Sequence, residues 1–124
     1  MDLNVNLRYL CLVYEDEEKI DALVERESEL IAAENLEYLG ELERSGHSIA
    51  AARLQPAETA TTIRVRDGSV FISNGATAGA KERLGAFYLI DARDLNDAIR
   101  IAAKMPAARL GSIEVRPLEE CDSG

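Results

Sequence analysis

The segment GAFYLIDA, residues 85–92, decides the fold because it is apolar at both its odd and its even positions. Side chains of a strand alternate between the two faces of a sheet, so a strand of this kind must be covered on both faces. The earlier segment LRYLCLVY, residues 7–14, has the same pattern and is rich in residues that favour strands. We therefore expect two strands that are buried on both faces.

Two helices are expected beside these strands. Residues 15–46 contain no proline and end at Gly46, which predicts one continuous helix of about thirty residues with a glycine C-cap. Its apolar residues share one broad face that should pack on the sheet; they are Ile20, Leu23, Val24, Leu30, Ile31, Leu39 and Leu42. Residues 93–106 predict a short helix capped by Asp94 and ended by Pro106, with a stripe of Leu95, Ala98, Ile99 and Ala102.

Further strands are expected at residues 47–54 and 111–118, the latter with Ile113 and Val115 facing inward. Residues 61–73 predict a hairpin, because the apolar alternation is interrupted by the two-residue turn Asp67-Gly68. The order is that of a split βαβ plan, an α+β ferredoxin-like fold with an inserted β-hairpin. Two helices cover only one sheet face, so we expect a second copy to cover the other through a two-fold axis.

The length of 124 residues predicts a single domain over residues 1–124, with residues 118–124 as a flexible tail. The net charge of −9 is local, since residues 15–44 hold twelve acidic and three basic residues and the remainder holds eleven of each. An acidic surface of this kind disfavours nucleic acid and anionic membranes as partners. A solvated helix face and an acidic docking site both explain it.

Cysteine and histidine usage gives no sign of a metal site or of a bound cofactor. Cys11 and Cys121 are far apart, and His47 is the single histidine. The N-terminal residues do not resemble an export signal, and no apolar run is long enough to cross a membrane. A cytoplasmic protein without metal or cofactor is therefore the expectation.

Two acids interrupt the apolar face of the predicted long helix. Glu27 and Glu34 project near its middle, and Tyr38 lies one turn beyond Glu34. A carboxylate is costly to bury without a partner, so each of these acids should either reach a rim or meet an arginine or hydroxyl in a cleft.

The segments TTIRVRDG (61–68), 74–86, YLID (88–91) and IEVRPL (113–118) together resemble the YCII-related superfamily, and specifically its DGPF branch. The resemblance covers nearly the whole chain. It implies a ferredoxin-like fold that pairs as a dimeric α/β barrel, with a cleft for a small molecule, while the function of the family is mostly unassigned. Fold analogy of this kind does not determine chemistry.

The loop at residues 74–82 departs from the pattern of the DGPF branch. Asn74 stands where the branch has an acid, Gly79 stands where it has a glutamate, and its proline and phenylalanine are missing. An amide can bind a ligand but does not act as a general base near neutral pH. The residues that match the branch are Gly75, Lys81, Glu82, Leu84 and Gly85.

These patterns predict a homodimer that binds or senses a small organic ligand in a cleft between the long helix, the 74–82 loop and the sheet. The candidate ligand contacts are Glu34, Tyr38, Asn74, Lys81 and Tyr88. One alternative is a metal-independent lyase or isomerase that uses Glu82 or His47 as acid or base. Against it, Lys81 and Glu82 also fit a surface pair, and His47 a polar strand edge. A second alternative is an interaction subunit that docks through the acidic helix.

Overall fold

The computed structural model describes residues 7–75 and 82–119. The main sheet has four strands in the order β2-β5-β1-β6, and all neighbouring strands are antiparallel. These strands are β1 (Leu7–Asp16), β2 (Ser48–Arg53), β5 (Glu82–Ala92) and β6 (Gly111–Pro117). Each helical connection therefore passes over one intervening strand, as in a split βαβ unit. The predicted α+β class is confirmed, and the strand order is consistent with a ferredoxin-like fold.

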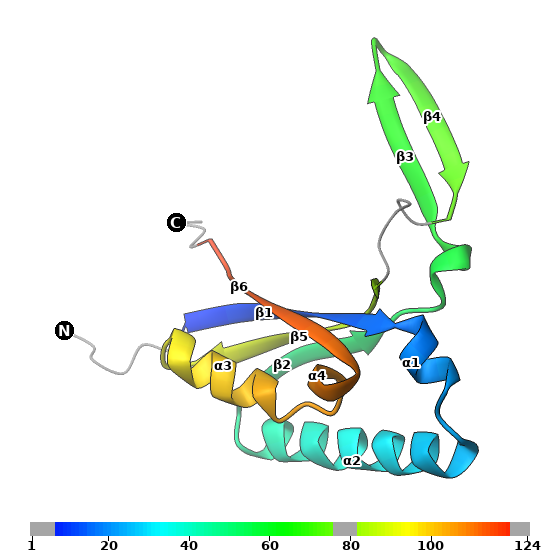
Figure 1. The fold of residues 1–124 in the computed structure, drawn as a ribbon. Coiled ribbons are helices and arrows are strands. Elements are labelled where there is room, and N and C mark those ends of the chain that lie inside the picture. Colours follow the sequence, from blue (N-terminus) through cyan, green and yellow to red (C-terminus); the bar gives the residue numbers. More distant parts are fainter. Residues whose placement is uncertain (1–6, 76–81, 120–124) are drawn as a thin grey trace, which may run out of the picture.

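The helices lie along one side of this sheet (Figure 1). They are α1 (Glu17–Asp21), α2 (Glu25–Arg44), α3 (Leu95–Ala103) and α4 (Ala107–Leu110). α4 was not predicted from the sequence. Pro106 is its N-cap; the fixed φ of proline suits a position next to a helix start, and its missing N–H leaves no donor unpaired there.

The prediction of one continuous helix over residues 15–46 is wrong, because α1 ends at Asp21 and α2 begins at Glu25. Asp16 caps α1 by accepting hydrogen bonds from the backbone N–H groups of Glu18 and Lys19. Val24 is extended, with ψ of 158°, and its N–H donates to Glu27 Oε1 at 3.0 Å. Glu27 is therefore an exposed capping residue that holds the start of α2.

The core lies between the helices and the inner face of the sheet. The sheet contributes the buried residues Tyr9, Cys11, Val13, Ala86, Tyr88, Ile90 and Ala92, which alternate along β1 and β5. Ile113 and Val115 of β6 pack against them, as predicted. On α3 the stripe is displaced from the prediction: Ile101 is buried together with Ala98 and Ala102, whereas Leu95 and Ile99 are about half exposed.

The predicted hairpin is confirmed as β3 (Thr61–Arg66) and β4 (Ser69–Asn74), joined by Asp67 and Gly68. Both turn residues have positive φ, 51° and 79°, as a type I′ turn requires. The short 3-10 helix η1 (Ala57–Thr59) precedes the hairpin. In Figure 1 the hairpin extends away from the main sheet, on the side opposite to the helices.

The outer face of the main sheet is also apolar. Leu10 pairs with Leu89 and Leu12 with Phe87 across β1 and β5, and strand alternation turns these side chains away from the helices. All four are partly exposed. Beyond β6, Leu118 donates its N–H to the Arg8 carbonyl at 3.0 Å. The remainder of the predicted tail, from residue 120, lies outside the described residues.

Candidate functional site

A cavity of about 550 Å³ lies between α2 and the inner face of the sheet. We call it the helix–sheet cavity. Its apolar lining includes Val13, Ile20, Leu23, Ile31, Leu36, Leu39, Ala51, Ala86, Pro106 and Leu110, and its polar lining includes Glu15, Ser28, Asn35, Arg53 and Tyr88. A cavity of this size, largely apolar with a few polar groups, is typical of small-molecule sites.

Small residues create the space. Ala32 of α2, Ala51 of β2, Ala86 of β5, Ala107 of α4 and Gly111 of β6 all line the cavity. Short side chains on facing elements leave a gap that long aliphatic side chains would fill. The predicted apolar face of the long helix therefore does not pack directly on the sheet along its full length. Leu42 is its buried member, Ile20, Leu23, Ile31 and Leu39 line the cavity, and Val24 and Leu30 are mostly exposed.

An amide and a hydroxyl form the inner polar feature of the cavity. Asn35 Nδ2 donates to the Tyr88 hydroxyl at 3.3 Å, and that hydroxyl lies 3.4 Å from Asn35 Oδ1. Tyr88 is buried, with 7% of its surface exposed, and it comes from the central strand β5. The pair therefore links α2 to the sheet across the cavity.

The rim of the cavity carries an ion pair. Arg53 Nη2 of β2 donates to Glu15 Oε2 of β1 at 3.2 Å. The side chain of Glu15 also lies against Gly85, where a Cβ atom would be 1.8 Å from Glu15 Oε1. Glycine at this position is therefore what allows the carboxylate to lie over β5. Glu15, Ile20 and Arg53 also line a neighbouring hollow of about 350 Å³.

Of the predicted ligand contacts, Tyr88 lines the helix–sheet cavity, whereas Glu34 and Tyr38 do not. Glu34 is exposed and makes two hydrogen bonds with Arg109 of α4, at 2.8 and 2.9 Å. The hydrogen bonds from Arg109 hold the pKa of Glu34 below its ordinary value. Glu34 therefore meets two of the expectations for an acid on this helix face, because it is exposed and it has an arginine partner.

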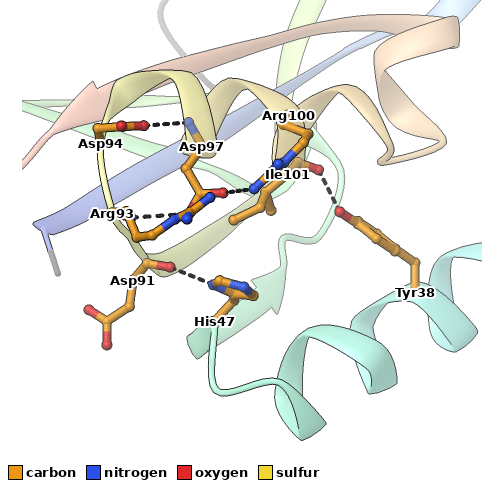
Figure 2. Close-up of polar contacts among 8 residues, drawn as sticks. All are labelled: Tyr38, His47, Asp91, Arg93, Asp94, Asp97, Arg100 and Ile101. Carbon is orange, nitrogen blue, oxygen red and sulfur yellow. Dashed lines mark hydrogen bonds and ion pairs between the residues drawn. The ribbon is translucent and has the colours of Figure 1, made fainter. Parts of the chain in front are cut away.

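Tyr38 belongs to a different polar cluster, formed between α2 and α3 (Figure 2). Its hydroxyl donates to the Ile101 carbonyl at 2.8 Å. Burial, followed by the nearby carboxylate of Glu41, raises the pKa of Tyr38. This hydrogen bond ties α2 to α3.

His47 lies in the same region, next to a smaller hollow of about 330 Å³. Its Nδ1 is 2.9 Å from the Asp91 carbonyl oxygen. A carbonyl only accepts hydrogen bonds, so Nδ1 carries the proton in this contact and the neutral ring has Nε2 as its acceptor. Figure 2 shows the imidazole directed toward the end of β5.

Asp97 is the buried acid of this cluster, with 4% of its surface exposed. It accepts from the Arg93 backbone N–H at 3.0 Å and pairs with Arg100, while its own N–H donates to Asp94 Oδ1 at 2.8 Å. The Arg93 hydrogen bond, together with Arg100, holds the pKa of Asp97 below its ordinary value. These contacts confirm Asp94 as the cap of α3 and fix the start of that helix.

The described residues of the predicted loop are not among the residues that line the cavity. Asn74 is exposed at the end of β4. Glu82 begins β5 and accepts from Ser112 Oγ at 2.5 Å. Lys81 lies outside the described residues. The structure thus brings neither Asn74 nor Glu82 to the helix–sheet cavity.

The sequence profile of the YCII-related domain family matches residues 7–122 of this chain. The chain belongs to the YCII-related domain family. It is also 34% identical over 112 residues to an uncharacterized protein of Rhizobium meliloti (strain 1021), covering 89% of this chain and 90% of that protein. The match to the YCII-related domain extends from β1 through β6 and so includes every element that lines the cavity.

Sequence reasoning missed four polar residues of this YCII-related domain that line the cavity, Glu15, Ser28, Asn35 and Arg53. Asn35 follows Glu34, whose charge on an apolar face attracted the prediction instead. The sequence carries no signal that singles these residues out, because the alanines of α2 and β2 that border the cavity face each other only after folding. Among residues 7–75 and 82–119, no His, Cys, Asp or Glu side chains group in threes to hold a metal ion. Within the same ranges, no helix is both long and apolar enough to span a membrane.

Proposed function

We propose that this YCII-related domain binds a small organic molecule in the helix–sheet cavity. The cavity itself is the observation that supports this function: its volume of about 550 Å³ lies within the range of ligand pockets, roughly 300–1,000 Å³. Its walls come from α2, α4 and the sheet, so a ligand there would be held by the main body of the domain. A binding or sensing role follows from these features.

The cavity favours binding over catalysis at this position. Glu82 and His47, the two acid–base candidates, are not among its lining residues. The lyase or isomerase alternative stays a prediction for those two residues, and Lys81 and Asn74 stay predicted ligand contacts of the 74–82 loop. Docking through the acidic helix also stays a prediction, because the acids of α2 are exposed.

Filling the cavity tests the proposed function. Ala32 lines the cavity, whereas the adjacent Ala33 does not, and both are exposed alanines on α2. We expect naphthalene to bind the wild-type protein and the Ala33→Trp variant with the same affinity. It should bind the Ala32→Trp variant at least tenfold more weakly, because the indole ring of the new tryptophan occupies the cavity. Ligand-detected NMR measures this. Equal affinity of all three proteins, or no binding to the wild type, would reject the cavity as the site.

We further propose that two copies pair through the outer face of the main sheet, as in a dimeric α/β barrel. The partly exposed Leu10, Leu12, Phe87 and Leu89 support this arrangement, since no helix covers them within the described part of the chain. Sedimentation should give a dimer at micromolar concentration, and Leu12→Glu should give a folded monomer, because a carboxylate would be buried in the interface. A wild-type monomer at that concentration would contradict the pairing.

We also propose that the chain falls in the DGPF branch of the family. Two of the residues that match the branch support it. Gly75 has a φ of 89°, a conformation that favours glycine. Gly85 leaves room for the Glu15 carboxylate, as described above. Both glycines, one at the start of the 74–82 loop and one in β5, therefore have structural reasons to be kept although Asn74 and Gly79 replace two acids of the branch pattern.

A further inference from the structure

The hydrogen bonds between Asn35 and Tyr88 are long. Their donor–acceptor distances, 3.3 Å for the N–H donor and 3.4 Å for the O–H donor, exceed the usual ranges of roughly 2.7–3.2 Å for N–H···O bonds and 2.5–3.0 Å for O–H···O bonds. Both contacts use the same hydroxyl oxygen, which lies between the two ends of the amide. A single oxygen in that position is too far from both Nδ2 and Oδ1 of the amide for either hydrogen bond to be strong. The pair is therefore weakly bonded for polar groups that line an apolar cavity.

The same pair has hydrogen-bonding capacity left over. A side-chain amide offers two N–H donors and an acceptor oxygen with two lone pairs, and a phenol offers one donor and an acceptor. Within residues 7–75 and 82–119, the Asn35 amide has no hydrogen-bond partner besides Tyr88. One N–H and one lone pair of Asn35 are thus available to a ligand, at a place where Tyr88 is buried.

The charges that line the cavity within the described residues are already paired with each other. Among residues 7–75 and 82–119, the charged lining residues are Glu15 and Arg53, which form the ion pair at the rim. An ion moved from water into the apolar interior loses hydration and finds no unpaired opposite charge among these lining residues. A neutral polar group avoids that cost and still gains the free donor and acceptor of Asn35.

From these contacts we infer that Asn35 and Tyr88 form a recognition pair for a neutral ligand, an apolar molecule that carries a hydroxyl or carbonyl group. The apolar body occupies the space between α2 and the alanines of the sheet. Its polar group replaces the long mutual contacts of Asn35 and Tyr88 with shorter bonds to both. The inference rests on the proposed small-molecule function and specifies the chemical class of the ligand.

Four probes of nearly equal shape test the inference: naphthalene, naphthol, naphthoate and naphthylmethylamine. One added neutral hydrogen bond should make naphthol bind the wild-type protein about three- to tenfold more tightly than naphthalene. The anionic and cationic probes should bind more weakly than naphthol, since neither charge finds a free partner among the lining residues that the structure describes. Dissociation constants come from NMR titration at one pH and one salt concentration.

The variant Asn35→Leu should bring the ratio of naphthol affinity to naphthalene affinity close to one, because leucine has a similar volume and favours helix but offers no hydrogen bond. Tyr88→Phe, which retains the ring, should also reduce the preference for naphthol over naphthalene. It provides the test if Asn35→Leu does not fold. Preference for naphthol that persists in the variants would overturn the recognition pair, and so would equal wild-type affinity for naphthol and naphthalene. Tighter binding of either charged probe would overturn the neutral class. Failure of all four probes to bind would instead reject the proposed function itself.

Discussion

Replacing Gly85 with alanine tests how closely the side chain of Glu15 lies against β5. Gly85 occupies an irregular position, since the register passes from Val13–Ala86 to Tyr14–Leu84 and leaves it without a partner on β1. A Cβ atom at Gly85 would lie 1.8 Å from Oε1, 2.4 Å from Cδ and 2.9 Å from Cγ of Glu15. These distances are too short for any of the three atoms to stay in place, so the whole carboxylate must move.

The cost follows from what Glu15 gives up. Its ion pair with Arg53 is partly solvated, with side-chain exposures of 23% and 66%, and is worth roughly 0.2–1 kcal/mol. A forced, unfavourable rotamer adds roughly 0.5–1.5 kcal/mol. The expected destabilisation through Glu15 is therefore about 1–2 kcal/mol. Alanine also restricts the unfolded chain, which returns about 0.4–1 kcal/mol.

A double-mutant cycle separates these contributions. Urea unfolding, at one protein concentration, gives the free energy of unfolding for the wild type, Gly85→Ala, Glu15→Ala and the double variant. We expect Gly85→Ala to destabilise the wild-type background and to be neutral or slightly stabilising when Glu15 is already alanine. The coupling free energy should be about 1–2 kcal/mol. A Gly85→Ala effect of the same size in both backgrounds would refute the close contact.

Three further variants probe groups outside the cavity. Asp97→Asn should lower the free energy of unfolding by roughly 1–3 kcal/mol near neutral pH. The Arg93 hydrogen bond depresses the pKa of Asp97 in the folded state, so the difference between variant and wild type should shrink as the pH falls below about 4. A difference that stays the same in urea titrations at acid pH would contradict this expectation. Burial raises the pKa of Cys11 to about 11. In a Cys121→Ser protein, in which Cys11 is the one remaining thiol, a thiol reagent should therefore label Cys11 at the rate of unfolding. Fast labelling of the folded protein would count against the burial of Cys11. Tyr38→Phe removes the hydrogen bond between α2 and α3 and should cost about 0.5–1.5 kcal/mol in urea unfolding, an expectation that an unchanged midpoint would disprove.

Local sequence signals predicted the hairpin and the central strands well. Asp67-Gly68 determines its turn through two positive φ angles, which is a property of the two residues themselves. The apolar pattern of residues 7–14 and 85–92 likewise identified β1 and β5, the two central strands of the main sheet. These features depend on neighbours in sequence, so the sequence was sufficient to predict them.

The break between α1 and α2 depended on contacts that the sequence does not display. Residues 22–24 contain neither glycine nor proline, and helix propensity alone favours continuation through them. The break is held by caps, Asp16 on α1 and Glu27 reaching back to Val24. An acid at a capping position and an acid on a helix face look alike in a sequence.

The cavity could not be predicted from amphipathicity, because periodicity gives the direction of a helix face and not its distance from the sheet. That distance depends on the alanines of four different elements, α2, β2, β5 and α4, which face one another only after folding. Glu34 was predicted as a ligand contact because of its charge, yet its partner Arg109 comes from α4, a helix that the sequence did not reveal. Asn35, one position later, faces the cavity instead.

A crystal structure of the wild-type protein with naphthol would show whether the helix–sheet cavity is a ligand site. We expect the naphthalene ring to lie between α2 and the sheet, beside Ala32 and Ala51, with the hydroxyl within about 3 Å of both the Asn35 amide and the Tyr88 oxygen. A ring found elsewhere on the protein, with the helix–sheet cavity free of ligand in crystals soaked to saturation, would contradict it.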